Sequence, residues 1–433
     1  MTAPSASPEL SGRAYLRLVL LGAAIGIPAA LVAAGFLALV HELEDFLWHD
    51  LPDDLGHSSP PWYLVIGLPA VGAGLVAVAR SLLPGDGGHR PLDGISMAPT
   101  PLAYGPGVAL AALGTLAFGS VLGPEAPLIA LGAVVGVAVT PLLKLGPREN
   151  TVLATAGSFS AISALFGGPL VAGMLLVEAG VGMGAALIPA LLPGLVAAAC
   201  GYVIFIGLGD WGGLDTTALA VAGLPEYDGT SVPDLLVGLV VGVLAAVVVV
   251  GVRHIAARID GLGGRRLAMP ALLIAGGLAV GVLAELADVL GADSQDVLFS
   301  GQASVPGLVA EDSTKIVLVL LVAKAIGYAI SLGCGFRGGP VFPAIFVGVA
   351  LATLAVNLFD VSPTLAVAVG AAAGMAAMTH LLFASLLLAA ILVGIPGLDA
   401  TPAAVLAAAG AWLTRTAMDR RLGDPTAKPA APH

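Results

Sequence analysis

GPEAPLIALG, at residues 123–132, returns in outline as GPVFPAIFVG at residues 339–348. The displacement, 339 minus 123, is 216 positions in a chain of 433 residues, so one half of the chain echoes the other. Long membrane proteins with internal repeats place a solute site where the copies meet, and apolar segments interrupted by Gly and Pro point to that site. The copies differ in charge, since Glu125 of the first is replaced by Val341 in the second.

The composition identifies a membrane protein. Hydrophobic residues make up 58% of the chain, charged residues only 10%, and the mean hydropathy is +1.01. No water-soluble domain of this size has such a composition, so we expect a polytopic membrane protein. Apolar runs that can cross about 30 Å of hydrocarbon recur from Leu16 to Leu413. Alternating ten-residue strands are absent, so the expected spans are helices.

The charges predict how the chain crosses the membrane. Basic residues cluster near both ends of the chain and at residues 253–266, whereas acidic residues gather at 42–54 and 210–234. Short basic loops face the cytoplasm. Both termini are therefore expected in the cytoplasm and the acidic middle outside, which makes a multi-pass protein of the cell membrane. Each half then crosses an odd number of times, which is the condition for an inverted repeat.

The predicted fold class is an all-α polytopic membrane protein with two inverted-topology halves. Gly and Pro interrupt the apolar runs at residues 84–91, 123–124, 167–169 and 333–343, so broken, re-entrant helices are expected. The expected parts are a cytoplasmic N-terminal tail at 1–15, a first membrane half-repeat at 16–208, an extracellular acidic linker at 209–231, a second half-repeat at 232–414, and a disordered cytoplasmic tail at 415–433.

The duplicated helix starts suggest an anion site. A helix that begins inside the membrane leaves N–H groups unpaired and carries about half a positive charge at that end. Two such starts, at Gly123 and Gly339, can converge on one point and attract an anion without Lys or Arg. Cys200 and Cys334 are isolated and form neither a disulfide framework nor a metal cluster. No metal, cofactor or nucleic-acid partner is expected.

These motifs resemble signatures of the CLC family of chloride channels and proton-coupled chloride transporters. GPEAP at 123–127 is similar to the family's Gly-Arg-Glu-Gly-Pro, and GGPVFP at 338–343 to its Gly-Gly-Ile-Phe-Ala-Pro. FGGPL at 166–170, running to Glu178, resembles its Phe-Asn-Ala-Pro-Leu segment. The landmarks fall in the family's order over about half of the chain. The resemblance implies a homodimer in the bilayer with one anion pathway per subunit.

The resemblance also implies site residues. Backbone amides of Ala126, Val341, Phe342 and Gly88 are expected to bind the anion, and Glu125 to act as the gate and proton acceptor. Glu125 lies at a helix start in an apolar run, where burial favours its neutral form and the helix dipole its ionised form. Ionised, it competes with an anion for the same amides; protonated, it can swing away. An intramembrane acid is a functional candidate by default.

Several positions depart from the family's signatures. Pro124 and Ala126 replace an Arg and a Gly, and Pro340 lacks the N–H that the family's residue offers to the anion. The loop that supplies an anion-binding serine in the family reads GDGGHRP at residues 85–91, which leaves either Asp86 or Gly88 in that place. Asp86 would repel an anion, so Gly88 is preferred.

The proton pathway departs as well. Glu178 matches the first of the family's acidic pair, but Ala179 replaces the inner proton-transfer glutamate, so weak or altered proton coupling is expected. For Glu178 a structural role near a helix end, close to Gly180, is favoured over a functional one. Lys324 and Arg337 are possible secondary residues that attract an anion, pair with acids or snorkel. His380 is a relay candidate, although a hydrogen-bonded core histidine is the commoner role.

The function that the sequence favours is transport of an anion, chloride first, across the cell membrane through a glutamate gate. Fluoride export remains open, because the family's fluoride branch also departs at the serine and inner-glutamate positions. An organic-anion transporter remains open too, since half-helix N-termini suit a carboxylate. An intramembrane hydrolase using Ser120 or Ser158 with His380 has less support, because no nucleophile motif accompanies these residues. We therefore expect a transporter rather than an enzyme.

Overall fold

The computed structural model describes residues 12–180, 187–212, 219–263 and 268–426. Within these ranges the chain is helical, and an isolated antiparallel bridge joins Gly123 to Gly339. Eight of the described helical segments are long and apolar enough to span a membrane. The predicted class of all-α polytopic membrane protein is confirmed.

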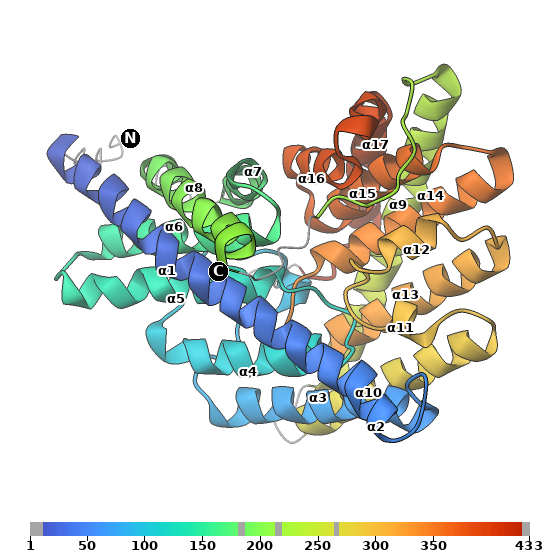
Figure 1. The fold of residues 1–433 in the computed structure, drawn as a ribbon, viewed down its shortest axis with the longest axis horizontal. Helices are drawn as coiled ribbons and strands as arrows, with labels where there is room; N and C mark the ends of the chain where they lie inside the picture. Colours follow the sequence, from blue (N-terminus) through green and yellow to red (C-terminus); the bar gives the residue numbers. More distant parts are fainter. Residues whose placement is uncertain (1–11, 181–186, 213–218, 264–267, 427–433) are drawn as a thin grey trace. The chain divides into compact units, whose positions relative to one another are not determined.

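The first half opens with a 43-residue helical segment and continues through shorter helices (Figure 1). Its elements are α1 (Gly12–Asp45), η1 (Phe46–Asp50), α2 (Leu51–Asp54), α3 (Trp62–Leu82), η2 (Pro91–Asp93), η3 (Leu102–Tyr104), α4 (Gly105–Leu116), α5 (Glu125–Leu142), α6 (Pro147–Leu165), α7 (Pro169–Ala179) and α8 (Leu187–Gly212).

The second half repeats this order of long and short helices. Its elements are α9 (Val232–Asp260), η5 (Gly261–Gly263), α10 (Ala268–Val289), α11 (Ser294–Val297), α12 (Val305–Val309), α13 (Thr314–Cys334), α14 (Val341–Phe359), α15 (Pro363–Thr379), α16 (Phe383–Val393), η6 (Ile395–Ala400) and α17 (Thr401–Leu422).

Helices begin at matching positions in the two halves of the sequence. α5 begins at Glu125 and α14 at Val341, and 341 minus 125 is 216. α6 begins at Pro147 and α15 at Pro363, again 216 positions apart (363 minus 147). Pro occupies the first helical position in both members of the second pair, where its missing N–H costs nothing. The breaks are therefore helix starts rather than kinks within longer helices.

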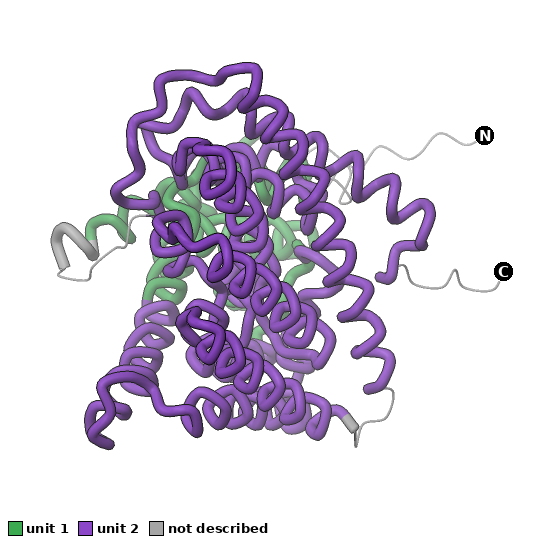
Figure 2. Tube along the Cα trace, turned by 90° about the vertical axis from the view of Figure 1, so that its right-hand side faces the viewer, with its two compact units in different colours: residues 1–34, 97–102, 128–216 green, residues 35–96, 103–127, 217–433 purple. Residues whose placement is uncertain are grey.

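Clustering of the backbone divides the chain into two compact units that do not follow the sequence halves (Figure 2). Unit 1 comprises residues 1–34, 97–102 and 128–216. Unit 2 comprises residues 35–96, 103–127 and 217–433, and so combines α3 and α4 of the first half with all the helices of the second.

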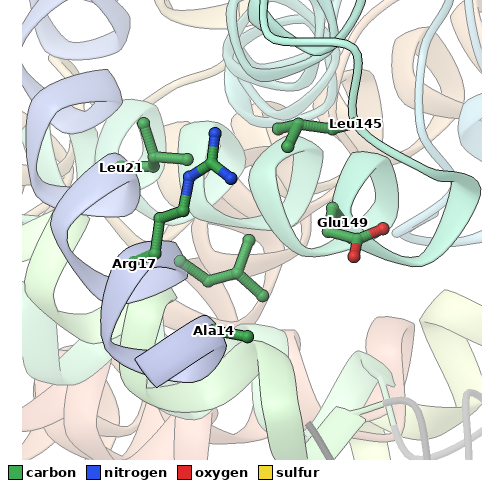
Figure 3. Close-up of a pocket in the computed structure, with 6 residues that line it drawn as sticks. Ala14, Arg17, Leu21, Leu145 and Glu149 are labelled. Atoms are coloured by element: carbon green, nitrogen blue, oxygen red, sulfur yellow. The ribbon is translucent and has the colours of Figure 1, made fainter. Parts of the chain in front are cut away.

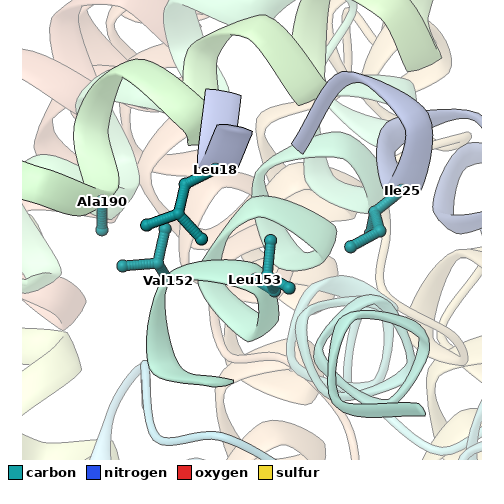
Figure 4. Close-up of a cluster of buried hydrophobic side chains, with 5 residues drawn as sticks. All are labelled: Leu18, Ile25, Val152, Leu153 and Ala190. Carbon is teal, nitrogen blue, oxygen red and sulfur yellow. The ribbon is translucent and has the colours of Figure 1, made fainter. Parts of the chain in front are cut away.

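Unit 1 has a small core of aliphatic side chains from three helices (Figure 4). The cluster is formed by Leu18, Ile25, Val152, Leu153 and Ala190. The helices also approach closely at small residues: Ser160 Oγ donates a hydrogen bond of 2.6 Å to the carbonyl oxygen of Gly26. Small residues let membrane helices pack backbone to backbone, which is where their association energy arises.

Unit 2 is held together by the same kind of contact. A Cβ atom on Gly277 or Gly281 of α10 would strike the backbone of α3 at Pro69 or Ile66, so these two helices meet at glycines. α14 packs against α15 in the same way, because Gly348 abuts the carbonyl of Gly370. The helices that carry the candidate site are therefore closely packed.

The C-terminal region differs from the prediction. Residues 415–433 were expected to be a disordered tail, but α17 continues to Leu422, and the structure orders the chain through residue 426. The reason is a buried arginine: Arg415 donates hydrogen bonds to the carbonyl oxygens of Ala377, at 2.8 Å, and Met378 at the end of α15. Residues 427–433 lie outside the described residues, as do residues 213–218 of the predicted linker.

Candidate functional site

The two copies of the pattern meet just before their helices begin. The amide of Gly123 donates to the carbonyl oxygen of Gly339 at 2.8 Å, and the amide of Gly339 donates back to Gly123. A Cβ atom on either glycine would strike the Glu125 carboxylate, so a side chain at either position would require the Glu125 side chain to move. The bridge sets the starts of α5 and α14 beside each other.

Glu125 binds across this bridge to the other copy. The residue is fully buried, and its Oε1 accepts a hydrogen bond of 2.9 Å from the amide of Phe342 in the first turn of α14. The amides of Val341 and of Glu125 itself also interact with the carboxylate. The acid of the first copy thus places its negative charge at the positive end of the helix of the second copy.

The other carboxylate oxygen of Glu125, Oε2, is buried and has no hydrogen-bond partner among the described residues. Leaving a buried acceptor unsatisfied costs about 1–3 kcal/mol, and more when the group is charged. The carboxylate is therefore attached to the amide end at one side only. A group held this way is stabilised by the helix end but not enclosed by donors.

Tyr328 and Pro340 fix the start of α14. Pro340 is the N-cap residue and has no N–H, and its carbonyl oxygen accepts a hydrogen bond of 2.6 Å from the Tyr328 hydroxyl on α13. Tyr328 is completely buried. This hydrogen bond to the N-cap residue was not predicted from the sequence. A signal existed, because a tyrosine in the buried stretch of an apolar helix needs a partner for its hydroxyl.

The glycine-rich loop places Gly88 and Asp86 differently from the prediction. The amide of Gly88, expected to bind the anion, donates to the carbonyl oxygen of Gly85 at 2.9 Å within the turn. Asp86, expected to repel an anion, pairs with two arginines, Arg80 at 2.9 Å and Arg337. Arg337 is thus joined to an acid, and it is buried.

Lys324 serves as a helix cap. Its ammonium is fully buried and donates to the carbonyl oxygens of Asp296, Val297 and Leu298 at 3.0, 3.2 and 2.6 Å. It also lies 4.7 Å from the centre of the Phe346 ring. Three carbonyl contacts at the end of α11 satisfy all three of its N–H donors. Lys324 thus contacts backbone carbonyls, which is neither the pairing with an acid nor the snorkelling considered from the sequence.

Glu178 and Ala179 are the last two residues of α7, both half-buried. Glu178 lies at the C-terminal end of α7, two residues before the C-cap residue Gly180, where the sequence places it. Ala126 is half-buried in the first turn of α5, next to Glu125. These placements leave Glu125, Val341 and Phe342 as the predicted site residues that the structure brings together.

The groups named for a hydrolase have different surroundings. Ser120 Oγ is buried and has no hydrogen-bond partner among the described residues. Ser158 Oγ donates to the carbonyl oxygen of Ile129 at 2.9 Å, as a buried helix hydroxyl commonly does. The His380 ring lies 5.4 Å from the Trp412 ring, and its Nε2 has no partner among the described residues. The described part of the chain contains no group of three or more His, Cys, Asp or Glu side chains able to hold a metal.

A surface pocket occurs in unit 1, between α1 and the corner joining α5 to α6 (Figure 3). Arg17 from α1 and Glu149 from α6 line it, with Leu18 and Leu145 among the apolar residues. Because one basic, one acidic and several aliphatic side chains line the pocket, it has no preference for an anion.

Comparison with solved structures identifies the fold. A structure described as a slow cyanobacterial Cl-/H+ antiporter matches with a TM-score of 0.75 at 16% identity, over 97% of this chain and 96% of that chain. A CLC-type fluoride/proton antiporter matches with a TM-score of 0.71 at 21% identity, over 94% and 98%. The predicted architecture of two inverted-topology halves with broken helices is confirmed.

Sequence relatives lead to the same family. The protein named "Putative ion-transport protein YfeO" from Escherichia coli O1:K1 is 31% identical over 350 residues, covering 78% of this chain and 79% of the relative. The family model described as voltage gated chloride channel matches residues 82–415, which include both copies of the repeated pattern. The chain therefore belongs to the voltage-gated chloride channel (CLC) family.

Proposed function

We propose that this protein transports small anions across the cell membrane, with chloride the first candidate, and that Glu125 is its gate. The observation that carries the proposal is the bond from the Phe342 amide to the Glu125 carboxylate. A helix N-terminus inside the membrane is an anion site, and here a side-chain anion occupies it. A mobile anion can use the same amides once that side chain leaves.

The exchange between the two anions follows from electrostatics. While Glu125 is ionised, it is the counter-ion of the α14 N-terminus, and a mobile anion has to displace it. Once protonated, the side chain loses most of that attraction and can turn away from the helix. The amides of Val341 and Phe342, with that of Ala126 on the facing helix start, then receive the mobile anion. Protonation of Glu125 thus opens the amides to the mobile anion.

Fluoride is the second candidate, because the family's fluoride branch also departs at the serine and inner-glutamate positions, as this chain does at residues 85–91 and Ala179. The two solved structures named above are a Cl-/H+ and a fluoride/proton antiporter. This chain lacks the amide at Pro340 and has no serine in the 85–91 loop, so its site offers fewer donors than the chloride signatures predict. An organic carboxylate is a third candidate, because half-helix N-termini suit it equally.

Proton coupling is proposed to be weak. A proton that leaves Glu125 toward the cytoplasm needs titratable groups along its way, and the family's inner glutamate is Ala179 here. Glu178, beside it at the end of α7, is the nearest replacement in sequence.

We also propose a homodimer with both termini in the cytoplasm and the acidic linker outside. The support is the charge distribution along the chain and the family's architecture. In a chain without Cys200 and Cys334, a cysteine at Asp228 should react with an impermeant reagent added outside intact cells, and one at Asp424 should not. Reaction of both from one side would contradict the inverted arrangement.

The test of function is a flux assay on the full chain in liposomes. Efflux of chloride, bromide, fluoride, nitrate and acetate is measured at several pH values, with empty vesicles as the control. We expect halide efflux that depends on pH. Selective fluoride efflux would favour the second candidate, and selective acetate efflux the third. If no anion moved at any pH, the proposed function would be wrong.

A further inference from the structure

Two arginines from opposite halves of the chain bind one acid. Arg80, near the end of α3, donates from Nε to Asp86 Oδ1 at 2.9 Å and from Nη2 to Oδ2 at 3.3 Å. Arg337, just before α14, donates from Nε to the carbonyl oxygen of Asp86 at 2.9 Å and from Nη2 to Oδ2. A single carboxylate thus receives both guanidinium groups.

The charges in this cluster do not balance. The Arg80 and Arg337 side chains are 14% and 3% exposed, and among the described residues Asp86 is the acid that forms an ion pair with either. Arg90 brings its own acid, Asp260, at 2.7 Å. Arg80 Nη1 also donates to the carbonyl oxygen of Gly335, the C-cap of α13, at 2.9 Å. That contact brings only a partial negative charge, so the two arginines still carry one full positive charge more than their shared acid supplies, which is costly for largely buried guanidinium groups.

A second arginine pair in the same unit shows the usual arrangement. Arg253 and Arg415 are also buried, but two acids meet them: Asp419 lies 3.3 Å from each, and Asp424 lies 2.8 Å from Arg253. This cluster is neutral. The excess charge at Arg80 and Arg337 is therefore a local feature and not a general property of buried arginines in this protein.

The geometry lets Asp86 leave. Its side chain is 55% exposed, whereas the arginines are buried beneath it. Asp86 has a φ of +50°, uncommon for a residue with a side chain, and the next residue, Gly87, packs against the stems of both arginines. The turn thus holds a movable carboxylate over fixed guanidinium groups.

The pair lies close to the candidate site. Arg337 precedes Gly339 by two residues, so their Cα atoms are at most about 7.6 Å apart. Gly339 forms the bridge to Gly123, and the amide of Arg337 donates to Thr115 Oγ1 at 3.2 Å. The backbone at Arg337 thus adjoins the bridge between the two helix starts.

We propose that Arg80 and Arg337 form a second anion-binding site for a small inorganic anion, and that Asp86 is a tethered anion which the mobile one displaces. Guanidinium groups present several fixed N–H donors, and they bind anions by charge-assisted hydrogen bonds. Displaced Asp86 is solvated, which costs little for a side chain already half in water. The place of this site on a transport route rests on the proposed function, whereas its anion binding does not.

The test is chloride binding to the purified full chain in detergent, measured by calorimetry. Asp86→Asn removes the competing charge and keeps the shape, so chloride should bind at least about threefold more tightly. Asp86→Ala should give the same change, which guards against an effect of the amide. Adding Arg337→Gln to Asp86→Asn should abolish the gain. Asp93→Asn, an exposed acid of the same loop, is the matched control and should match the wild type.

The outcomes separate this inference from the proposed function. Unchanged or weaker chloride binding in both Asp86 variants would overturn the inference, even if Glu125 variants altered flux as proposed. A gain that persisted in the Asp86→Asn/Arg337→Gln variant would also overturn it. Tighter binding in the Asp86 variants, lost with Arg337, would support the arginine site even if the wild-type chain moved no anion in liposomes.

Discussion

The two copies of the repeated pattern have the same backbone plan but unequal chemistry. In both copies a helix begins at the third residue of the pattern, and the first glycines of the two copies exchange backbone hydrogen bonds. Only the first copy carries an acid, Glu125, where the second has Val341. Both copies therefore provide a helix N-terminus with a partial positive charge, but only one provides a titratable side chain. The difference suggests a division of roles, with one copy providing the movable charge and the other a receptor for it.

The surroundings of the copies agree with this division. All residues of α14 from Val341 to Ala350 are buried, and Tyr328 holds its N-cap. In the first copy Pro124 and Ala126 are only half-buried. The second half of the chain also contains two buried arginines, Arg253 on α9 and Arg415 on α17, whose counterparts 216 positions earlier are Leu37 and Ala199.

The largest expected effect comes from removing the difference in charge. Glu125→Gln keeps the shape of the side chain but does not titrate, so anion flux in liposomes should lose its pH dependence and anion-coupled proton movement should stop. Glu125→Ala should do the same and also raise passive flux, because it opens space at the amide end. Both changes are read with a chloride electrode and a pH electrode.

Glu226→Gln is the control for these variants, since Glu226 is an exposed acid of the linker segment. It should behave as the wild type. If the Glu125 variants kept the flux and pH dependence of the wild type, Glu125 would be structural and the two copies would be functionally equal.

A smaller effect is expected from removing the hydrogen bond that holds the start of α14. Tyr328→Phe removes the hydrogen bond to the Pro340 carbonyl, which should destabilise the protein by about 0.5–1.5 kcal/mol and lower flux a few-fold. Thermal unfolding in detergent and flux at a fixed pH measure the two changes. Tyr104→Phe, at an exposed tyrosine, should change neither. Equal effects of the two substitutions would show that the fixed start of α14 is unimportant.

The smallest effect concerns the ion pair between Asp424, after α17, and Arg253 of α9. Burial alone would raise the pKa of Asp424, but hydrogen bonds from Thr426 and the charge of Arg253 hold that pKa below its ordinary value of 3.8. A lowered folded-state pKa contributes stability above the unfolded pKa, and this contribution is lost as the pH falls below 3.8. Asp424→Asn should therefore cost about 0.5 kcal/mol at neutral pH, as for a partly exposed ion pair.

The pH dependence checks this assignment. The difference in unfolding temperature between Asp424→Asn and the wild type should shrink as the pH is lowered below 3.8. A difference that stayed constant or grew in acid would show that the carboxylate charge is not what ties the C-terminal residues to α9.

Sequence sufficed for the features that depend on local pattern. Apolar runs with Gly and Pro at their ends predicted the broken helices, and the duplicated motif predicted that α5 and α14 would start at matching positions. The position of Glu125 at a helix start followed from the same pattern. That its carboxylate binds the Phe342 amide of the other copy, 217 residues away, was implied by the family resemblance, since the local pattern alone does not bring the two residues together.

What sequence did not reveal depends on pairing between distant residues. Asp86 was considered only as a charge that repels anions, because nothing in the glycine-rich loop shows that Arg337, 251 residues away, binds it. Tyr328 had a detectable need for a partner, but the identity of that partner depends on the packing of α13 against α14. The order of residues 415–426 was missed because short polar sequence is common in disordered tails as well as in helices.

The interleaving of the halves within unit 2 has a consequence for how the chain is made. α3 presents its backbone at Pro69 and Ile66 to two glycines of α10, which is synthesised about 200 residues later. Contacts of such long sequence separation form late, since loop closure has to precede them. α3 must therefore wait in the bilayer, inserted but without its partner, until the second half has emerged from the ribosome. A fragment that ends before Val232 should insert into the membrane but remain susceptible to proteolysis, and co-expression of the missing half should protect it.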